Sequence, residues 1–454
     1  MFGDTIAAIA TPIGEGALSI VRISGPTAVR VADECFRGGK NPSEMPSHTV
    51  SYGRVVDKRG DTIDRVLLTV MRGPGTSTGE DTVEISCHGG RVPSALVLEQ
   101  VLAAGARLAE AGEFTRRGFL NGRMDLVQAE GVVEIIQART DAGLRAAVRQ
   151  AGGEVSRELR SLRGELDECR VHLECEIDFA EDTAPWSDEE MGKKLADVAR
   201  RLEAMLDRCR LGRRLQDGTD VAIVGKPNVG KSTLFNCLVG EDRVIVSDKP
   251  GTTRDVVAEW ISMGGVPTRL LDTAGIRSGT SGIEEIAVER ARREGKRAEI
   301  VLHLLDAAGV PDDEDRKALT GCSGDQVLLV LNKIDFGVRR EVENLVSGLG
   351  PGVPVVRVSA LRGDGVDDLK QELGRRIAGN LEPEVGVPAS VRQIDILRRT
   401  YDMVIKSVDA INSGGIEIAA VDLREAVEAF GDLSGETTSE EILERIFSRF
   451  CIGK

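Results

Sequence analysis

The stretch DVAIVGKPNVGKSTLFN, residues 220–236, indicates the fold of the central part of this chain. Within it, GKPNVGKS matches the phosphate-binding pattern GxxxxGK[ST], follows an apolar run typical of a buried strand, and opens a helical pattern. The glycines allow backbone N–H groups to face a nucleotide's phosphates, while Lys231 can reach the β and γ oxygens and Ser232 can hold Mg²⁺. The stretch therefore predicts a P-loop at the edge of a parallel sheet.

Three further motifs follow the P-loop in order, each at the end of a strand-like run. In DTAG, Asp272 can bind the metal through water, and the amide of Gly275 is placed for the γ-phosphate. In NKID, Asp335 can accept two hydrogen bonds from the N1–H and 2-amino groups of guanine, which adenine cannot offer in that way. A backbone amide of SAL (359–361) can reach the guanine oxygen. The ordered set predicts a GTPase.

The group that orients the attacking water is not the usual one. Many small GTPases carry a glutamine directly after DTAG, but this chain has Ile276, which cannot orient water. Glu284 and Glu285 offer replacement carboxylates downstream, although acids at such a position also favour the start of a helix. The residues alone leave these two readings open.

Positive charge for the transition state has two candidate sources. Thr253 in PGTTRD (250–255) is the natural second hydroxyl for Mg²⁺. Asn228 in the P-loop can help hold a monovalent cation against the phosphates, or can simply bond its own backbone. Arg254 as an arginine finger is less favoured, because it follows the magnesium threonine directly.

The composition indicates a soluble, globular chain of roughly three domains. Its 454 residues are 41% hydrophobic and 29% charged, and neither an apolar run long enough for a membrane span nor a secretory leader is present. Eight scattered cysteines without a CxxC pair favour a reducing cytoplasm. The net charge of −15 means that an RNA partner must meet a local basic patch or be held partly by another protein.

The pattern along the chain predicts a multidomain protein with an insertion. Residues 1–118 alternate β-like runs with glycine turns and form an α+β domain. Residues 119–216 are helical, and residues 217–379 alternate buried strands with helices, as expected for an α/β P-loop GTPase domain with a Ras-like parallel sheet. Residues 380–454 return to helical patterns, so the two helical segments are predicted to form one domain around the insertion.

Local patterns give three further predictions about helices. Residues 94–109 follow the strand runs with an apolar helical pattern. Apolar residues from Leu144 to Leu173 repeat at helical spacing, which predicts one long packed helix face. Ser187, followed by acids, is the predicted N-cap of another helix.

Outside the GTPase motifs, the chain resembles the tRNA modification GTPase family MnmE, also called TrmE. The resemblance rests on TIAAIATPIGEGALSIVRISG, GEDTVEISCHGG and GEFTRRGFLNGRMDLVQAE in the first third of the chain, and on FCIGK at its end. These strings are distinctive, because many GTPases share the middle motifs. The resemblance covers essentially the full length.

The resemblance implies a homodimer that works on tRNA with an FAD-carrying partner, MnmG (GidA). Together they would install a carboxymethylaminomethyl or aminomethyl group at C5 of the wobble uridine. The one-carbon unit would come from a tetrahydrofolate derivative, in the 5-formyl or 5,10-methylene form. The implied folate contacts are Arg22, Glu80, Arg123 and Lys454. Arg123 stands where a lysine is sometimes seen in the family. The positive charge is kept, but a planar guanidinium makes its contacts in a different geometry from an ammonium group.

The resemblance also implies potassium-dependent pairing of the GTPase domains and selects Glu284 as the residue that orients water. The expected K⁺ ligands are Asn228, Ser247, Lys249 through its carbonyl, and Thr252, while Ser232 and Thr253 are the expected Mg²⁺ ligands. The predicted GTP contacts are Asn228, Val229, Gly230, Lys231, Ser232, Thr233, Ser247, Thr252, Thr253, Asp272, Thr273, Ala274, Gly275, Asn332, Lys333, Asp335, Ser359, Ala360 and Leu361.

The tail FCIGK (450–454) places a cysteine fourth from the end of the chain. Gly453 and Lys454 do not fit a prenylation box, so we expect no lipid anchor and no membrane partner. Cys451 is then either a catalytic nucleophile toward an activated uracil ring or an incidental thiol on a frayed end.

Two rival functions stay open. One is a non-modifying GTPase switch in ribosome assembly, and the other is a free-standing folate enzyme with a regulatory GTPase. Residues 1–118 argue against the first, because a pure switch needs no anion- and pterin-binding pocket ahead of its GTPase domain. Activity on a one-carbon donor without tRNA or MnmG would favour the second.

Overall fold

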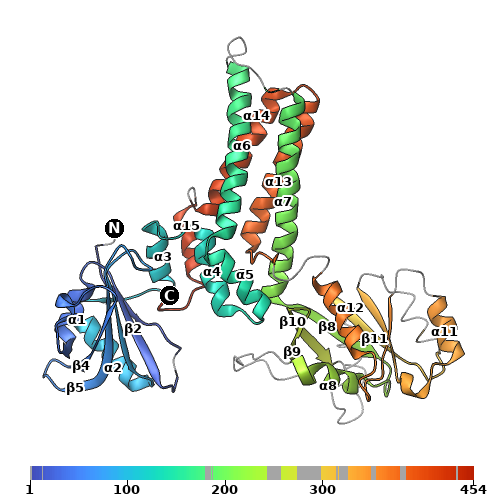
Figure 1. Cartoon of the computed structure of the whole chain (residues 1–454), viewed down its shortest axis with the longest axis horizontal. Helices are drawn as coiled ribbons and strands as arrows, with labels where there is room; N and C mark the ends of the chain where they lie inside the picture. Colours follow the sequence, from blue (N-terminus) through green and yellow to red (C-terminus); the bar gives the residue numbers. More distant parts are fainter. Residues whose placement is uncertain are drawn as a thin grey trace. The chain divides into compact units, whose positions relative to one another are not determined.

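The computed structural model describes residues 3–12, 14–178, 186, 188–242, 257–272, 298–312, 315, 326–348, 354–378, 385–435 and 438–454. The chain forms two compact units, each assembled from separate segments (Figure 1). The first contains Met1–Val133, Ala151–Glu168 and Leu423–Lys454, and the second contains Glu134–Gln150 and Cys169–Asp422. Among the described residues, no helix has the length and apolar character needed to cross a membrane.

The first unit is built on a seven-stranded sheet with the order β3-β4-β5-β6-β2-β1-β7. Neighbouring strands are antiparallel except for β1 and β7, which are parallel. The strand-rich pattern predicted for this region is confirmed. The strands are β1 (Ile6–Ile9), β2 (Leu18–Ser24), β3 (Phe36–Gly38), β4 (Thr49–Val56), β5 (Thr62–Met71), β6 (Thr82–His88) and β7 (Arg107–Leu108).

One face of this sheet packs against α1 (Ala28–Cys35) and α2 (Arg91–Ala103). Alternate strand residues such as Val21 and Leu68 enter that core. The helix predicted over 94–109 ends at Ala103, because Gly105 has φ of +112° and β7 begins two residues later.

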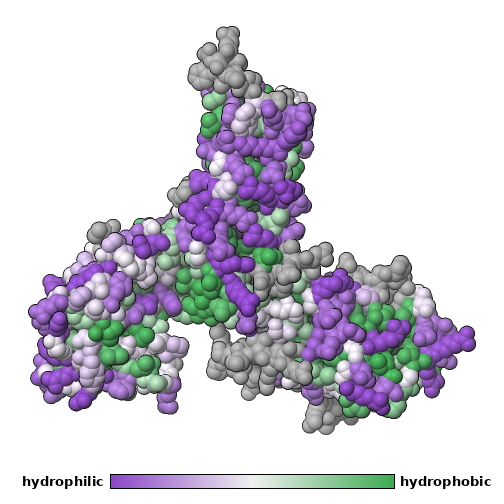
Figure 2. All heavy atoms as spheres, in the orientation of Figure 1, coloured by the Kyte–Doolittle hydropathy of each residue, from purple (hydrophilic) through white to green (hydrophobic). Residues whose placement is uncertain are grey.

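The opposite face of the same sheet leaves large apolar side chains exposed. Tyr52 of β4 lies directly opposite Leu67 of β5, and both are exposed, as are Val50 and Leu18. Figure 2 shows hydrophobic residues, in green, at the surface of the N-terminal domain. Such a patch is typical of an interaction surface.

The helical segments contain α3 (Glu113–Leu120), α4 (Leu126–Gln137), α5 (Asp141–Ala151), α6 (Glu154–Asp178), α7 (Asp188–Asp217), α13 (Val391–Asn412), α14 (Ile416–Ser434) and α15 (Glu440–Phe447). Helix α7 begins at Asp188, beside the predicted cap Ser187, which lies outside the described residues. Helix α13 begins with a capping box between Ser390 and Gln393.

The prediction of one continuous packed helix face from Leu144 to Leu173 is wrong. The chain breaks between α5 and α6, where Gly153 has φ of +80° and Gln128 donates a hydrogen bond to the final carbonyl of α5. Leu144 is exposed, whereas the apolar positions from Val155 onward are buried. A left-handed glycine ends a helix without steric cost, and a spacing pattern does not register that break.

The second unit contains a six-stranded sheet with the order β13-β12-β11-β8-β10-β9. Its strands are β8 (Thr219–Gly225), β9 (Val257–Met263), β10 (Val266–Asp272), β11 (Ile300–Asp306), β12 (Val327–Asn332) and β13 (Val355–Arg357). Helices α8 (Lys231–Asp242), α11 (Arg340–Ser347) and α12 (Val366–Ala378) accompany it. Five strands are parallel, as predicted for a Ras-like sheet.

Strand β9, which the sequence patterns did not single out, adds an antiparallel strand to the parallel ones. It pairs antiparallel with β10 through a tight turn at Gly264 and Gly265, which have φ of +57° and +83°. A two-residue turn can only join antiparallel neighbours, so β9 forms an antiparallel edge.

Candidate functional site

The P-loop lies between the end of β8 and the start of α8. Gly225 and Gly230 have positive φ, and a Cβ at either position would clash with a neighbouring residue. A Cβ on Gly225 would lie 2.6 Å from the carbonyl oxygen of Leu304, and one on Gly230 would lie 2.2 Å from Nδ2 of Asn332. Asn228 adopts the left-handed conformation, with φ of +64°. The loop is therefore fixed in a shape that only this pattern of residues adopts without strain.

The side chains predicted to bind phosphate lie at the N-terminus of α8. Nζ of Lys231 donates hydrogen bonds to the carbonyl oxygens of Gly225 at 2.8 Å and Lys226 at 2.6 Å, so its ammonium group lies over the loop. Ser232 and Thr233 are exposed in the first turn of the helix. Backbone N–H groups and the helix dipole favour an anion at this position.

Lys226 fixes the outer side of the P-loop, a contact that the sequence patterns did not predict. Its Nζ lies 2.7 Å from Oδ2 of Asp315 and also pairs with Asp312. Burial alone would lower the pKa of Lys226, but the two carboxylates outweigh it and raise that pKa. The acidic run after β11 was the available signal, and it looks like an ordinary solvated loop in the sequence.

Asn332 joins the P-loop to the predicted guanine-binding loop. Its Nδ2 donates to the carbonyl of Val229 at 2.8 Å, and its Oδ1 accepts from the backbone N–H of Ala360 at 3.0 Å. The side chain is buried, so both hydrogen bonds are protected from water. The motifs at residues 225–232, 332–335 and 359–361 therefore meet at the C-terminal ends of the parallel strands.

Asp335 faces the same loop from the turn after β12. Its Oδ1 accepts a hydrogen bond from the hydroxyl of Ser359 at 2.8 Å. Nζ of Lys333 lies 2.7 Å from Oδ2 of Asp306, and Leu361 is exposed. A carboxylate held beside an exposed apolar side chain can accept N–H groups from a flat purine ring.

Other predicted site residues lie outside the described residues. They are Ser247, Lys249, Thr252, Thr253, Thr273, Ala274, Gly275 and Glu284. The backbone of Asp272 ends β10, which runs parallel to β8 beside the P-loop strand, and its side chain is also outside the described part.

A second group of polar residues lies in the first unit, around Glu80. The carboxylate of Glu80 accepts a hydrogen bond from the Ser24 hydroxyl at 2.9 Å and contacts Nη1 of Arg117 at 3.3 Å. Thr76 donates its hydroxyl to the carbonyl of Glu80 at 2.7 Å, and its own carbonyl accepts from Nε of Arg123 at 3.2 Å. Two of the implied folate contacts, Glu80 and Arg123, are therefore connected through Thr76.

Arg22 connects this sheet to the end of the chain. Its Nε donates to Glu84 at 2.9 Å, its Nη1 donates to the carbonyl of Gly453 at 3.3 Å, and its guanidinium lies over the ring of Phe114. Arg22 and Ser24 occupy alternate positions of β2 and so share one face of the sheet. The tail carrying Lys454 therefore reaches the face that carries the Glu80 group.

The tail is fixed to the N-terminal domain of its own chain, which argues against a frayed end. Ile452 forms an antiparallel bridge with Ala111, and the carbonyl of Cys451 accepts from Gly112 N–H at 3.4 Å. Gly453 has φ of +95°, and a Cβ there would lie 2.4 Å from the carbonyl oxygen of Ile9. The Cys451 thiol is exposed.

Helix α15 holds the tail in place through buried aromatic side chains. Phe447 and Phe450 pack with Leu126 and Ala129 of α4 in one buried cluster. The aromatic rings of Phe447 and Phe450 are 5.3 Å apart between centroids.

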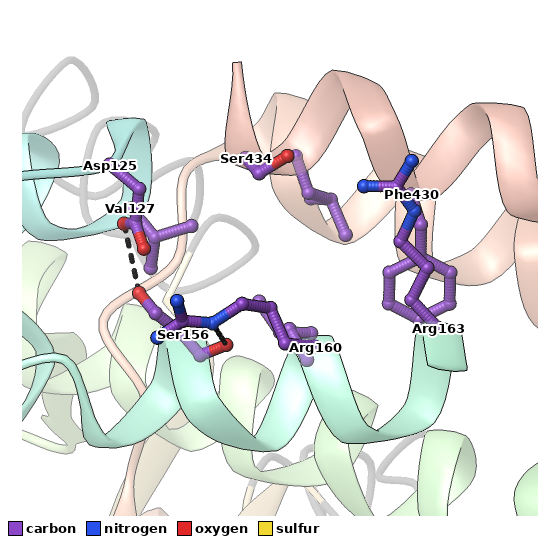
Figure 3. Close-up of a pocket in the computed structure, with 9 residues that line it drawn as sticks. Asp125, Val127, Ser156, Arg160, Arg163, Phe430 and Ser434 are labelled. Atoms are coloured by element: carbon purple, nitrogen blue, oxygen red, sulfur yellow. Dashed lines mark hydrogen bonds between the residues drawn. The ribbon is translucent and has the colours of Figure 1, made fainter. Parts of the chain in front are cut away.

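A small hollow lies between the ends of α4, α6 and α14 in the first unit (Figure 3). Figure 3 shows the carboxylate of Asp125 directed toward the hydroxyl of Ser156, which donates to it at 2.9 Å. Nε of Arg160 donates to the Ser156 carbonyl at 3.2 Å. With a volume of about 20 Å³, the hollow has room for about one water molecule and none for a nucleotide or folate.

Comparison with known proteins gives matches along nearly the whole chain. The family model described as "GTP-binding protein TrmE N-terminus" matches residues 5–123, and the "MnmE helical domain" model matches residues 126–451. A protein of Symbiobacterium thermophilum named "tRNA modification GTPase MnmE" is 46% identical over 456 residues, covering 99% of each chain. The protein of the same name from Bacillus subtilis is 40% identical over 459 residues, covering 99% of this chain and 100% of its own.

Among solved structures, the FeoB G-domain from Methanococcus jannaschii is 28% identical and covers 35% of this chain and 97% of its own, with a TM-score of 0.26. That TM-score is too low to support a conclusion about this chain. The family assignment rests on the two family models and the full-length relatives. The chain belongs to the MnmE family of tRNA modification GTPases.

Proposed function

We propose that the chain couples GTP hydrolysis to the addition of a carboxymethylaminomethyl or aminomethyl group at C5 of the wobble uridine of tRNA, together with the FAD-carrying protein MnmG. As a member of the MnmE family, the chain is a GTP hydrolase that takes part in tRNA modification. The observation that best supports the proposed uridine modification is the hydrogen bond from Arg22 to the carbonyl of Gly453. It joins the C-terminal tail to an N-terminal polar site in a chain that also carries a GTPase domain.

The proposed nucleotide site uses the residues that meet at the C-terminal ends of the parallel strands of the second sheet. Lys231 and the N-terminus of α8 bind the phosphates. Asp335 accepts the guanine N–H groups, and the Ser359 hydroxyl orients this carboxylate by donating to its Oδ1. Ser232 and Thr253 are the proposed Mg²⁺ ligands, and Asn228 is the proposed anchor for K⁺. The left-handed backbone of Asn228 and its exposed side chain support that assignment.

The chemistry of the N-terminal site fits a folate. A pterin ring presents adjacent N–H donors that suit the Glu80 carboxylate, and the folate's glutamate presents carboxylates that suit Arg22, Arg123 or Lys454. When bound, the folate supplies the one-carbon unit. The chain's own residues orient it, and the tail carries the exposed thiol of Cys451, which is the proposed nucleophile toward the uracil ring.

A homodimer is the proposed assembly, and the exposed face of the N-terminal sheet supports it. Tyr52, Leu67, Val50 and Leu18 are all exposed on strands whose opposite face is covered by helices. A second copy placed on these residues would remove apolar surface from water. The described cysteines are free thiols, which supports a reducing cytoplasm as the compartment.

Reconstitution tests the proposal directly. The purified chain, MnmG, unmodified tRNA, GTP and a tetrahydrofolate donor should yield wobble uridines with the mass of the modified base. Omission of GTP, or Lys231→Ala, should remove the product. A ribosome-assembly switch predicts no modified uridine in any mixture, whereas a free-standing folate enzyme predicts turnover of the donor without tRNA or MnmG.

A further inference from the structure

The Glu80 carboxylate is held by a ring of hydrogen bonds that begins and ends on Glu80 itself. The backbone N–H of Glu80 donates to the Thr78 hydroxyl at 3.2 Å, and the Thr78 and Ser24 hydroxyls are 2.8 Å apart. Ser24 in turn donates to Oε2 of Glu80 at 2.9 Å. Because each hydroxyl has a single proton, this chain of donors requires Thr78 to donate to Ser24.

A fully buried arginine holds the same carboxylate from the other side. Arg117 is 0% exposed, and its Nη1 lies 3.3 Å from both oxygens of Glu80, whose side chain is 6% exposed. Nη2 of Arg117 donates to Asp4 and to Glu113, each at 2.9 Å. The planar guanidinium is thus fixed by several acceptors at once and cannot swing away from Glu80.

These contacts leave the Glu80 carboxylate part of its capacity as an acceptor. A carboxylate offers about four lone-pair directions, and the described contacts are one hydroxyl and one shared guanidinium N–H. With its orientation locked by Ser24 and Arg117, the group can accept further hydrogen bonds only along fixed directions. A ligand therefore has to bring N–H donors in matching positions.

We infer that Arg117 and Ser24 are positioning residues that present the Glu80 carboxylate to a ligand with two adjacent N–H donors, such as the 2-amino-4-oxopyrimidine ring of a pterin. This inference rests on the proposed folate site and identifies the residues that determine the selectivity of that site for its ligand. A buried polar group built to accept N–H donors discriminates strongly against ligands that lack them. The part of the folate without the pterin, p-aminobenzoylglutamate, should not depend on Arg117 or Ser24.

The test is calorimetric binding of 5-formyltetrahydrofolate and of p-aminobenzoylglutamate to the full-length chain and to three variants. Ser24→Ala removes one donor to Glu80, and Arg117→Lys keeps the charge but loses the planar fork. Arg107→Gln is the matched control, because Arg107 binds Asp4 and Glu113 of the same network but does not contact Glu80. Thermal melts verify that each variant is folded.

Ser24→Ala and Arg117→Lys are expected to weaken binding of 5-formyltetrahydrofolate about 10- to 100-fold, the range for a lost hydrogen bond to a charged group. Binding of p-aminobenzoylglutamate should change less than about twofold in both variants, and Arg107→Gln should bind both compounds like the wild type. Should Arg117→Lys fail to fold, Ser24→Ala decides the matter.

Two outcomes overturn the inference, and a third overturns its basis. Wild-type affinity for 5-formyltetrahydrofolate in folded Ser24→Ala would show that the ring of hydrogen bonds does not present Glu80. Equal losses for both compounds would indicate a general structural defect. A wild-type chain that binds no folate would instead refute the proposed folate site.

Discussion

Asp335→Asn is expected to weaken GTP binding strongly while leaving the fold intact. Oδ1 of Asp335 accepts the Ser359 hydroxyl at 2.8 Å, and the side chain is 4% exposed. The amide oxygen of asparagine can keep this contact. Its NH₂ group then replaces the second carboxylate oxygen and faces an N–H of guanine, donor against donor.

The size of the effect follows from these contacts. A hydrogen bond to a charged acceptor contributes about 1.5–3 kcal/mol, and leaving buried donors unpaired costs about 1–3 kcal/mol more. We expect a loss of about 3–4 kcal/mol, which corresponds to a dissociation constant for GTP that is roughly 10²- to 10³-fold higher. Xanthosine triphosphate carries a 2-carbonyl oxygen that can accept from the new NH₂, so it should bind this variant better than GTP does.

Competition against a fluorescent GTP analogue measures both effects. Asp364→Asn is the matched control, because Asp364 lies in the same loop, is exposed, and contributes its backbone carbonyl to Ser359 N–H. An affinity for GTP within about threefold of the wild type in Asp335→Asn, or no preference for xanthosine triphosphate, would refute the assignment of Asp335 to the guanine base.

Three further predictions concern charge and water. GTP hydrolysis should be at least about tenfold faster in potassium than in sodium; Asn228→Ala should erase that difference and Arg254→Ala should not, whereas a rate indifferent to the salt rules the cation out. Glu284→Ala should lower kcat about 100-fold with little change in GTP affinity, and an equal loss in Glu285→Ala would indicate only a helix-terminus effect. Burial would raise the pKa of Glu113, but hydrogen bonds from Arg107, the Glu110 N–H and Arg117 outweigh it and lower that pKa. This contribution to stability is present above the usual carboxyl pKa and is lost as the pH falls through the lowered value. Glu113→Gln should therefore cost about 3 kcal/mol at pH 7 and progressively less below about pH 4 in denaturant titrations, and a pH-independent difference would contradict the network.

The elements and the nucleotide motifs were predictable because each leaves a local signal. Alternation along β5 and the glycine pattern before Lys231 depend on near neighbours in the chain. The edge strand β9 and the break at Gly153 escaped prediction, since each depends on whether a glycine adopts positive φ. That choice is made by the surrounding packing.

The polar network around Glu80 could not be predicted, since its members come from distant parts of the chain. Ser24, Glu80 and Arg117 lie on β2, the loop before β6 and α3, and only the fold brings them together. The spacing of Glu113 and Arg117 by four residues was a visible hint of an ion pair within one helix. It gave no indication that Arg117 is buried against Glu80.

The position of the C-terminal tail also depends on contacts between residues that are distant in the sequence. Only glycine fits at position 453, because a Cβ there would lie 2.4 Å from the carbonyl oxygen of Ile9. Arg22 binds the carbonyl of Gly453 across 431 positions of the chain. The resemblance of FCIGK to the family motif pointed to the tail. Its attachment to the N-terminal sheet of its own chain is a finding of the structure.

The mass of wobble uridines in tRNA is the decisive test of the proposed tRNA modification. The measurement compares cells lacking this protein with the same cells carrying either the full chain or a chain truncated after Phe450. We expect the modified uridine to disappear without the protein, to return with the full chain, and to stay absent with the truncated chain, although the truncated chain still hydrolyses GTP. Normal wobble modification in cells that lack the protein would contradict the proposed function, and full modification with the truncated chain would contradict the role given to the tail.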